Sequence, residues 1–132
     1  MFKYGCTCRT RCRHRPRWNL ERLRRLAKRS ETSAVRPSRA LDPTARRLGV
    51  SLVAAEEYVR GTVQLLRDVD FVESVALVDE WFDVYGSDRD GIGWYVKLNE
   101  GDDGLVVISH HPPERPLTTI TGRVIRLLEP TK

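Results

Sequence analysis

Four side chains in the second half of the chain have the chemistry that metal-free cleavage of RNA requires. They are Tyr95, Lys97, His110 and His111. RNA can be cut without a metal when one group removes the proton of a 2′-hydroxyl, another protonates the leaving oxygen, and cations stabilise the phosphate. Imidazole exchanges protons near neutral pH, a phenol donates hydrogen bonds, and an ammonium group supplies positive charge. We therefore predict a catalytic set made of Tyr95, Lys97 and one of the two histidines.

The segment around these residues, 71–111, predicts four strands at about 71–77, 81–86, 93–99 and 105–110. Runs of β-branched and aromatic residues alternate with the turn sequences GSDRDG and NEGDDG, whose aspartates fit turns better than metal ligands. Neighbouring side chains on a strand point to opposite faces, so Tyr95 and Lys97 share one face. Only one of the two histidines shares that face. A histidine at a strand end is more often an ordinary surface residue than a catalyst. The prediction of a catalytic set therefore depends on Tyr95, Lys97 and a histidine sharing one face of the sheet.

Three helices are expected before the strands, at about 19–29, 38–48 and 51–67. Apolar residues recur at helical spacing in the first and third, Asn19 and Ser51 are suitable N-caps, and Gly49 can end the second. Residues 30–37 are expected to be a linker. Helices followed by adjacent short strands predict an α+β fold, in which two or three N-terminal helices pack on an antiparallel sheet of about four to six strands.

The charge is unevenly distributed along the chain. Residues 1–48 hold fifteen Lys and Arg against three acidic residues, whereas residues 49–132 hold eight against fifteen. A basic block of this kind suggests a polyanionic partner, RNA above all, or an acidic protein that masks it. Genomic codon preference for arginine, and an ordinary solvated helix face, are the alternatives. The candidate RNA-binding residues are Arg22, Arg25, Arg60, Arg67 and His110.

Several functional classes are excluded or disfavoured by what the sequence lacks. It has no apolar run that could span a membrane, no secretory signal, no glycine-rich phosphate loop, and no zinc-protease or serine-hydrolase motif. We expect a cytoplasmic protein without a cofactor. Three cysteines suit a reducing compartment. Cys6, Cys8, Cys12 and His14 have the ligand types of a zinc site, but their spacing is too tight, so a basic tail is favoured over a metal site.

An ordered set of motifs resembles the MqsR family of toxin–antitoxin ribonucleases. The set is D-F-x-x-S from Asp70, W-x-D-V-Y from Trp81, a glycine at 91 or 93 followed by Y-x-K-L ending at Leu98, and V-V-I-S ending at Ser109. The resemblance covers about residues 17–111. We therefore divide the chain into a basic, disordered tail at 1–17, a toxin-like domain at 18–111 and a C-terminal extension at 112–132.

The resemblance implies a RelE-like α+β fold and a metal-independent mRNA endoribonuclease that a cognate antitoxin neutralises. The site tyrosine of the family corresponds to Tyr95. Three other site positions differ: a lysine corresponds to Glu73, a glutamine to Phe82, and a lysine at the end of the last strand to His111. The resemblance therefore implies that His111 is the catalytic histidine, in a set with Tyr95 and Lys97. These differences leave open a second possibility, a non-catalytic module that binds nucleic acid or a partner on a degenerate toxin scaffold.

Overall fold

The computed structural model describes residues 9–126. Its helices are α1 (Leu20–Leu26), α2 (Asp42–Leu48) and α3 (Leu52–Leu65). The main sheet is built from β1 (Arg11–Cys12), β2 (Ser33–Val35), β3 (Phe71–Leu77), β4 (Glu80–Arg89), β5 (Ile92–Gly101) and β6 (Gly104–His111). A separate hairpin consists of β7 (Leu117–Thr118) and β8 (Val124–Ile125).

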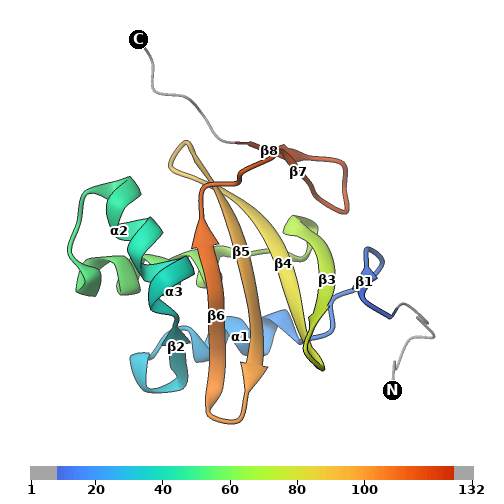
Figure 1. The fold of residues 1–132 in the computed structure, drawn as a ribbon, viewed down its shortest axis with the longest axis horizontal. Coiled ribbons are helices and arrows are strands. Elements are labelled where there is room, and N and C mark those ends of the chain that lie inside the picture. The colour runs from blue at the N-terminus through green and yellow to red at the C-terminus, as the bar shows by residue number, and fades with distance from the viewer. Residues whose placement is uncertain (1–8, 127–132) are drawn as a thin grey trace.

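The six strands form one sheet in the order β1-β3-β4-β5-β6-β2 (Figure 1). Strands β3 to β6 are a meander of antiparallel neighbours joined by short turns, as the sequence predicts. Strand β2 runs parallel to β6, so the sheet is mixed rather than wholly antiparallel. The prediction of an α+β fold is confirmed, and the architecture is consistent with the RelE-like arrangement that the resemblance implies.

Local sequence signals set the helix ends. The side chain of Asn19 accepts a hydrogen bond from the backbone N–H of Arg22, and the side chain of Ser51 accepts one from Ala54. Gly49 ends α2 in the left-handed region at φ 69°, where glycine carries no Cβ penalty. Helix α1 ends earlier than predicted, at Leu26, where the hydroxyls of Thr32 and Ser33 donate to the Leu26 carbonyl oxygen and satisfy a terminal carbonyl of the helix.

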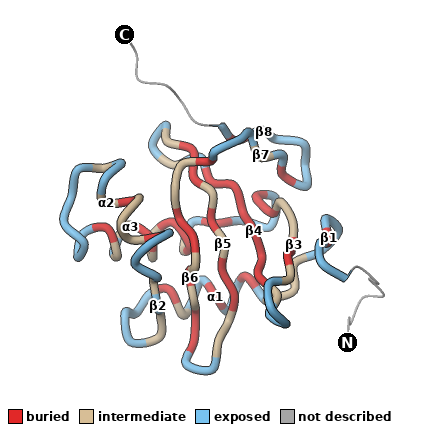
Figure 2. Tube along the Cα trace, in the orientation of Figure 1, coloured by how far each residue is buried: buried red, intermediate tan, exposed pale blue. Residues whose placement is uncertain are grey.

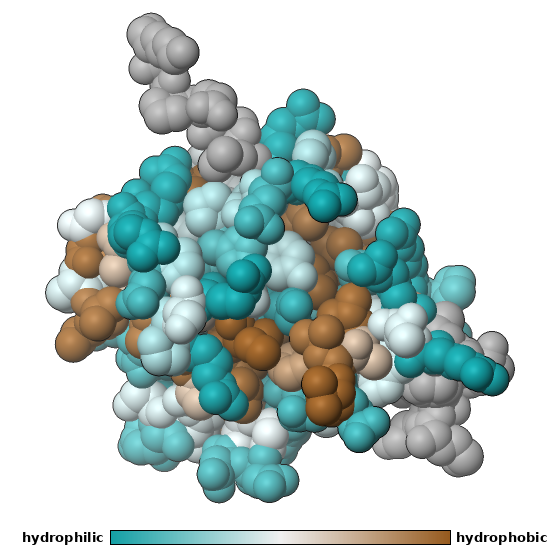
Figure 3. Space-filling view, viewed as in Figure 1, coloured by the Kyte–Doolittle hydropathy of each residue, from teal (hydrophilic) through white to brown (hydrophobic). Residues whose placement is uncertain are grey.

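The two faces of the sheet have different surroundings (Figures 1 and 2). One face, here called the helix face, carries the main core. It packs Trp94, Val96 and Leu98 of β5 against apolar side chains of α1 and α3. The other, here called the open face, carries a smaller cluster formed by Val75, Phe82 and Val84 with Val72, Tyr95 and Ile108. Figure 3 looks onto the open face, where hydrophobic residues gather near the middle and hydrophilic residues surround them.

Segments that we predicted to be a tail, a linker or an extension contribute strands to the fold. Residues 11–12, predicted within a disordered tail, form β1 and pair with β3. The predicted linker at 30–37 contains β2. The C-terminal segment forms the β7–β8 hairpin. Propensity could not reveal β1 and β2, because their pairing partners β3 and β6 lie far away in the sequence. Within residues 9–126, the structure has no helix with the length and apolarity needed to cross a membrane.

Candidate functional site

A cavity of about 470 Å³ lies on the open face where β3, β5 and β6 approach the two terminal segments. Its volume is in the range of small-ligand sites, and its lining is rich in cations and hydrogen-bond donors. The lining residues are Arg11, Arg13, Arg39, Val72, Glu73, Tyr95, His111, Glu114, Arg115, Pro116, Leu117 and Thr118.

Two of the predicted catalytic residues meet in this cavity. Tyr95 on β5 and His111 on β6 are directly paired in the sheet register. Their rings stack with centroids 5.0 Å apart and an interplanar angle of 12°. Cross-strand neighbours on one face of a sheet are held at this separation by the backbone, so neither ring needs a mobile loop to reach the other. The phenol and the imidazole are therefore presented together as a rigid pair.

The contacts of His111 define which of its nitrogens carries a proton. Nδ1 lies 2.8 Å from the carbonyl oxygen of Pro112, which can only accept a hydrogen bond, so Nδ1 is the donor. Nε2 lies 3.4 Å from Nη2 of Arg39, which can only donate. With Nδ1 as the donor, the lone pair of Nε2 is directed towards Arg39 in the cavity. A nitrogen that holds a lone pair can act as a base.

Burial shifts the other two predicted catalytic groups in opposite directions. It raises the pKa of Tyr95, and the nearby Glu73 carboxylate raises it further, so the phenol stays protonated at neutral pH. Burial lowers the pKa of Lys97, as does the positive charge of Arg39. The ammonium nitrogen of Lys97 lies 5.9 Å from the centroid of the Tyr95 ring. The open face therefore combines a proton donor, a base and two cationic side chains.

Two glycines make room for one wall of the cavity. A Cβ on Gly86 would lie 2.9 Å from Cγ1 of Ile125, and one on Gly93 would lie 2.5 Å from the Arg126 carbonyl oxygen. The β7–β8 hairpin therefore lies directly over β4 and β5, and Leu117 lines the cavity beside it. Sequence reasoning missed this wall, because a glycine in a strand signals a close approach without naming what approaches.

The structure does not bring His110 to this cavity. Its ring is fully buried on the helix face, stacked on Trp94 at 4.3 Å between centroids. The Thr44 hydroxyl donates to the His110 carbonyl oxygen at 3.0 Å and lies 2.7 Å from Nδ1. The Thr62 hydroxyl lies 3.0 Å from Nε2, so both ring nitrogens have a hydrogen-bond partner inside the protein. Burial lowers the pKa of His110 to about 3, so the ring is neutral and structural rather than an RNA contact.

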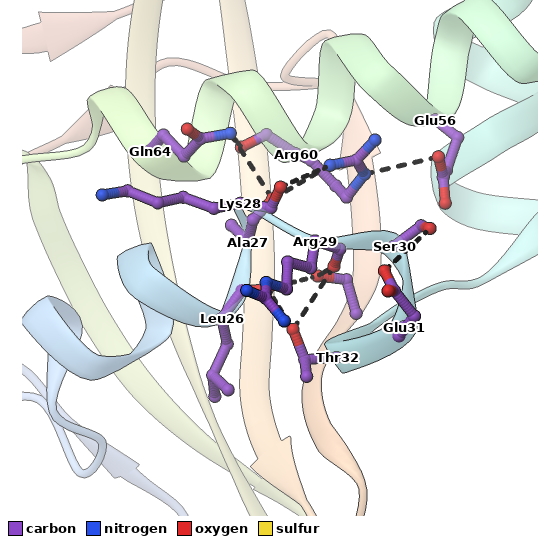
Figure 4. Close-up of polar contacts among 11 residues, drawn as sticks. Leu26, Ala27, Lys28, Arg29, Ser30, Glu31, Thr32, Glu56, Arg60 and Gln64 are labelled. Carbon is purple, nitrogen blue, oxygen red and sulfur yellow. Dashed lines mark hydrogen bonds and ion pairs between the residues drawn. The ribbon is translucent and has the colours of Figure 1, made fainter.

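The predicted RNA-binding arginines also lie away from the cavity. Arg60 is tied into the helix layer, where its guanidinium contacts Glu56 and the carbonyl oxygens of Ala27 and Lys28 (Figure 4). These contacts cap the end of α1 and leave little of the Arg60 side chain exposed to solvent. The remaining three pair with nearby carboxylates: Arg22 with Glu100 at 2.8 Å, Arg25 with Glu21 at 3.0 Å, and Arg67 with Asp70 at 3.6 Å.

Sequence reasoning overlooked four arginines that do line the cavity, Arg11, Arg13, Arg39 and Arg115. No periodic pattern distinguishes them from other arginines, because they reach the cavity from three separate segments. Arg39 also lines a neighbouring groove of about 720 Å³. Phe82 and Asn99 line that groove as well, so it runs beside the first along the same face.

Of the four residues with the ligand types of a zinc site, Cys6 and Cys8 lie outside the described residues. Cys12 is buried, with its Sγ 3.8 Å from Nδ1 of His14. Within residues 9–126, no group of three or more His, Cys, Asp or Glu side chains is arranged to hold a metal ion. In comparisons with known proteins, no family model and no curated protein matches the chain.

Proposed function

We propose that this chain is a metal-independent endoribonuclease that cleaves mRNA in the cytoplasm as the toxin of a toxin–antitoxin pair. The observation that carries the ribonuclease proposal is the stacked pair of Tyr95 and His111 in a cavity lined by arginines. The neutralising antitoxin and the choice of mRNA rest on the resemblance described above. The basic surface agrees with a polyanionic substrate, because phosphate contacts dominate the affinity of proteins for nucleic acid.

The reaction assigned to this pair is attack of a ribose 2′-oxygen on the adjacent phosphorus. Nε2 of His111, which holds a lone pair, takes the 2′-hydroxyl proton as the new P–O bond forms. The Tyr95 phenol, which stays protonated, donates to the 5′-oxygen as its bond to phosphorus breaks. The products are a 2′,3′-cyclic phosphate and a 5′-hydroxyl, and no metal or other cofactor takes part.

The cationic side chains around Tyr95 and His111 are assigned the stabilisation of the negative charge that develops on the phosphate during cleavage. Arg39 approaches Nε2 of His111, and Lys97 lies over the Tyr95 ring. Fixed positive groups at the point where negative charge develops are usually the largest contribution to such catalysis. Arginine suits this role because its planar fork matches the phosphate oxygens.

One feature favours the alternative, a binding module without catalysis. Glu73 places a carboxylate in the same cavity and is coupled electrostatically to Tyr95 and Lys97. A negative charge at this point opposes the approach of RNA, and Phe82 adds no polar group to the neighbouring groove. RNA binding that weakens steeply with salt, without any cleavage product, would select this alternative.

The test is incubation of single-stranded RNA with purified protein in EDTA, followed by analysis of the fragments. The wild type is expected to yield fragments with cyclic-phosphate ends. The Tyr95→Phe and His111→Ala variants are each expected to cleave about 10²- to 10⁴-fold more slowly, because each removes one proton-transfer group.

Tyr85→Phe is the matched control, because Tyr85 lies buried on the helix face of β4. It loses the same hydroxyl group without touching the cavity and is expected to cleave at the wild-type rate. Intact RNA with the wild type, or equal rates for wild type, Tyr95→Phe and His111→Ala, would refute the enzymatic proposal.

A further inference from the structure

The segment before α1 is fastened along the β3 edge of the sheet at several points. The backbone N–H of Ala76 donates to the Thr10 carbonyl oxygen at 2.9 Å, and the Ser74 hydroxyl donates to that of Arg15 at 3.2 Å. The backbone N–H groups of Arg17 and Trp18 both donate to the Asp83 carboxylate at 2.9 Å. Residues 10–18, here called the N-terminal arm, therefore have a defined course.

The arm presents two arginines to the catalytic cavity. Arg11 and Arg13 both line it, and both contact Oε1 of Glu73 through Nε, at 3.2 and 3.6 Å. The two side chains alternate around Cys12, which is buried, so the extended backbone directs them to one side. The side chain of Glu73 is only 15% exposed, and its carboxylate holds both guanidinium groups in place.

These contacts leave most of each guanidinium available to a ligand. The Arg11 and Arg13 side chains are 59% and 73% exposed, and Nε supplies the contact to Glu73 in both. The Nη edge, with the larger share of the N–H donors, is therefore open to another acceptor. Two arginines against one carboxylate also leave a net positive charge at this end of the cavity.

We infer that the N-terminal arm is part of the RNA-binding site, and that Arg11 and Arg13 hold an RNA phosphate beside the one that is cleaved. This inference rests on the proposed ribonuclease function. Glu73 then serves to position the two arginines rather than to repel the substrate. An RNA strand would cross the open face from the arm at the β1 edge, over Tyr95 and His111, to Arg39.

The substrate class that fits this course is single-stranded RNA. The cationic groups lie on both sides of an aromatic pair, which is the combination that binds unpaired nucleotides by phosphate contact and stacking. The second groove, which shares Arg39 and carries Phe82 and Ile108, continues the same face for a following nucleotide.

The experiment measures the affinity of the full-length protein for a single-stranded oligonucleotide with 2′-O-methyl groups, which prevent cleavage, from 50 to 250 mM salt. The double variant Arg11→Ala/Arg13→Ala is compared with Arg46→Ala/Arg47→Ala, which removes two exposed charges from α2. The arm variant is expected to bind about tenfold more weakly at 0.1 M salt. Because the two arginines hold one phosphate, its log–log salt slope should be shallower by about 0.7.

The control variant should retain the wild-type salt slope, and equal slopes for the two double variants would overturn the inference. Cleavage of unmodified RNA by the wild type separates this result from the proposed function. If the wild type cleaves but the arm variant binds normally, only the role of the arm fails. If the wild type binds without cleaving and the salt slope of the arm variant is shallower, the role of the arm in RNA binding is supported and the proposed nuclease activity is refuted. A wild type that neither binds nor cleaves refutes both.

Discussion

Consecutive histidines at the end of β6 have opposite surroundings, and the contrast separates the two faces of the sheet. His110 is sealed on the helix face between Thr44 and Thr62, with burial lowering its pKa to about 3. His111 lies half-buried on the open face, stacked on Tyr95. The pleat forces the two rings apart, because neighbouring side chains on a strand point to opposite faces.

The contrast shows how one strand can serve stability on one side and chemistry on the other. The imidazole of His110 uses both nitrogens within the protein, so it has nothing left to offer a substrate. His111 has one nitrogen fixed by the Pro112 carbonyl oxygen, while the other contacts the exposed guanidinium of Arg39, at 3.4 Å, inside the cavity. The helix face thereby holds β6 in place, and the open face presents the reactive group on a rigid support.

The largest expected effect is the difference in stability between His110→Ala and His111→Ala. Truncation of His110 empties a packed site beside Trp94 and leaves the hydroxyls of Thr44 and Thr62 without their ring partner, at a cost of about 3–5 kcal/mol. Truncation of His111 should cost under about 1 kcal/mol, because its ring lies at the surface of the sheet. Urea unfolding of both variants measures the difference. Comparable losses would show that the two faces do not differ as described.

A smaller effect is expected from acid. Burial lowers the pKa of His110 to about 3 in the folded protein. In the unfolded chain this imidazole is protonated near pH 6.5, whereas in the native chain it stays neutral down to about pH 3. Stability from this group is therefore complete above about pH 6.5 and falls by up to ~1.4 kcal/mol per pH unit below it.

Urea unfolding at pH 7, 6 and 5 measures this acid dependence in the wild type and in His110→Gln. Contributions from carboxyl groups are common to both proteins, so the wild type should show the steeper loss of stability. Equal pH dependence in the two proteins would contradict a neutral, buried His110.

The smallest effect is expected from Gly86→Ala on the open face. The added methyl group would lie 2.9 Å from Cγ1 of Ile125, so the β7–β8 hairpin must shift, at a cost of about 1–2 kcal/mol. Ile125→Ala removes the clashing atoms. The double variant should therefore lose less stability than the sum of the single variants, as measured by urea unfolding. Simple additivity would mean that the hairpin does not lie on Gly86.

Much of the central architecture could be predicted from the sequence, because its signals are local. Alternation in 71–111 indicated the four strands of the meander. The same rule put Tyr95 and Lys97 on one face. It also required one histidine to lie on each side, although it could not say which residue of the pair would face Tyr95.

Only the tertiary structure decided the membership of the candidate site. A bulge between Lys97 and Leu98 sets the register in which His111, rather than His110, meets Tyr95. Arg11, Arg39 and Arg115 come together because three distant segments meet on one face. The arginine-rich α1 drew attention in the sequence, yet it lies on the helix face. Periodicity acts over a few residues and determines the strands, whereas a cavity depends on long-range packing that no local pattern encodes.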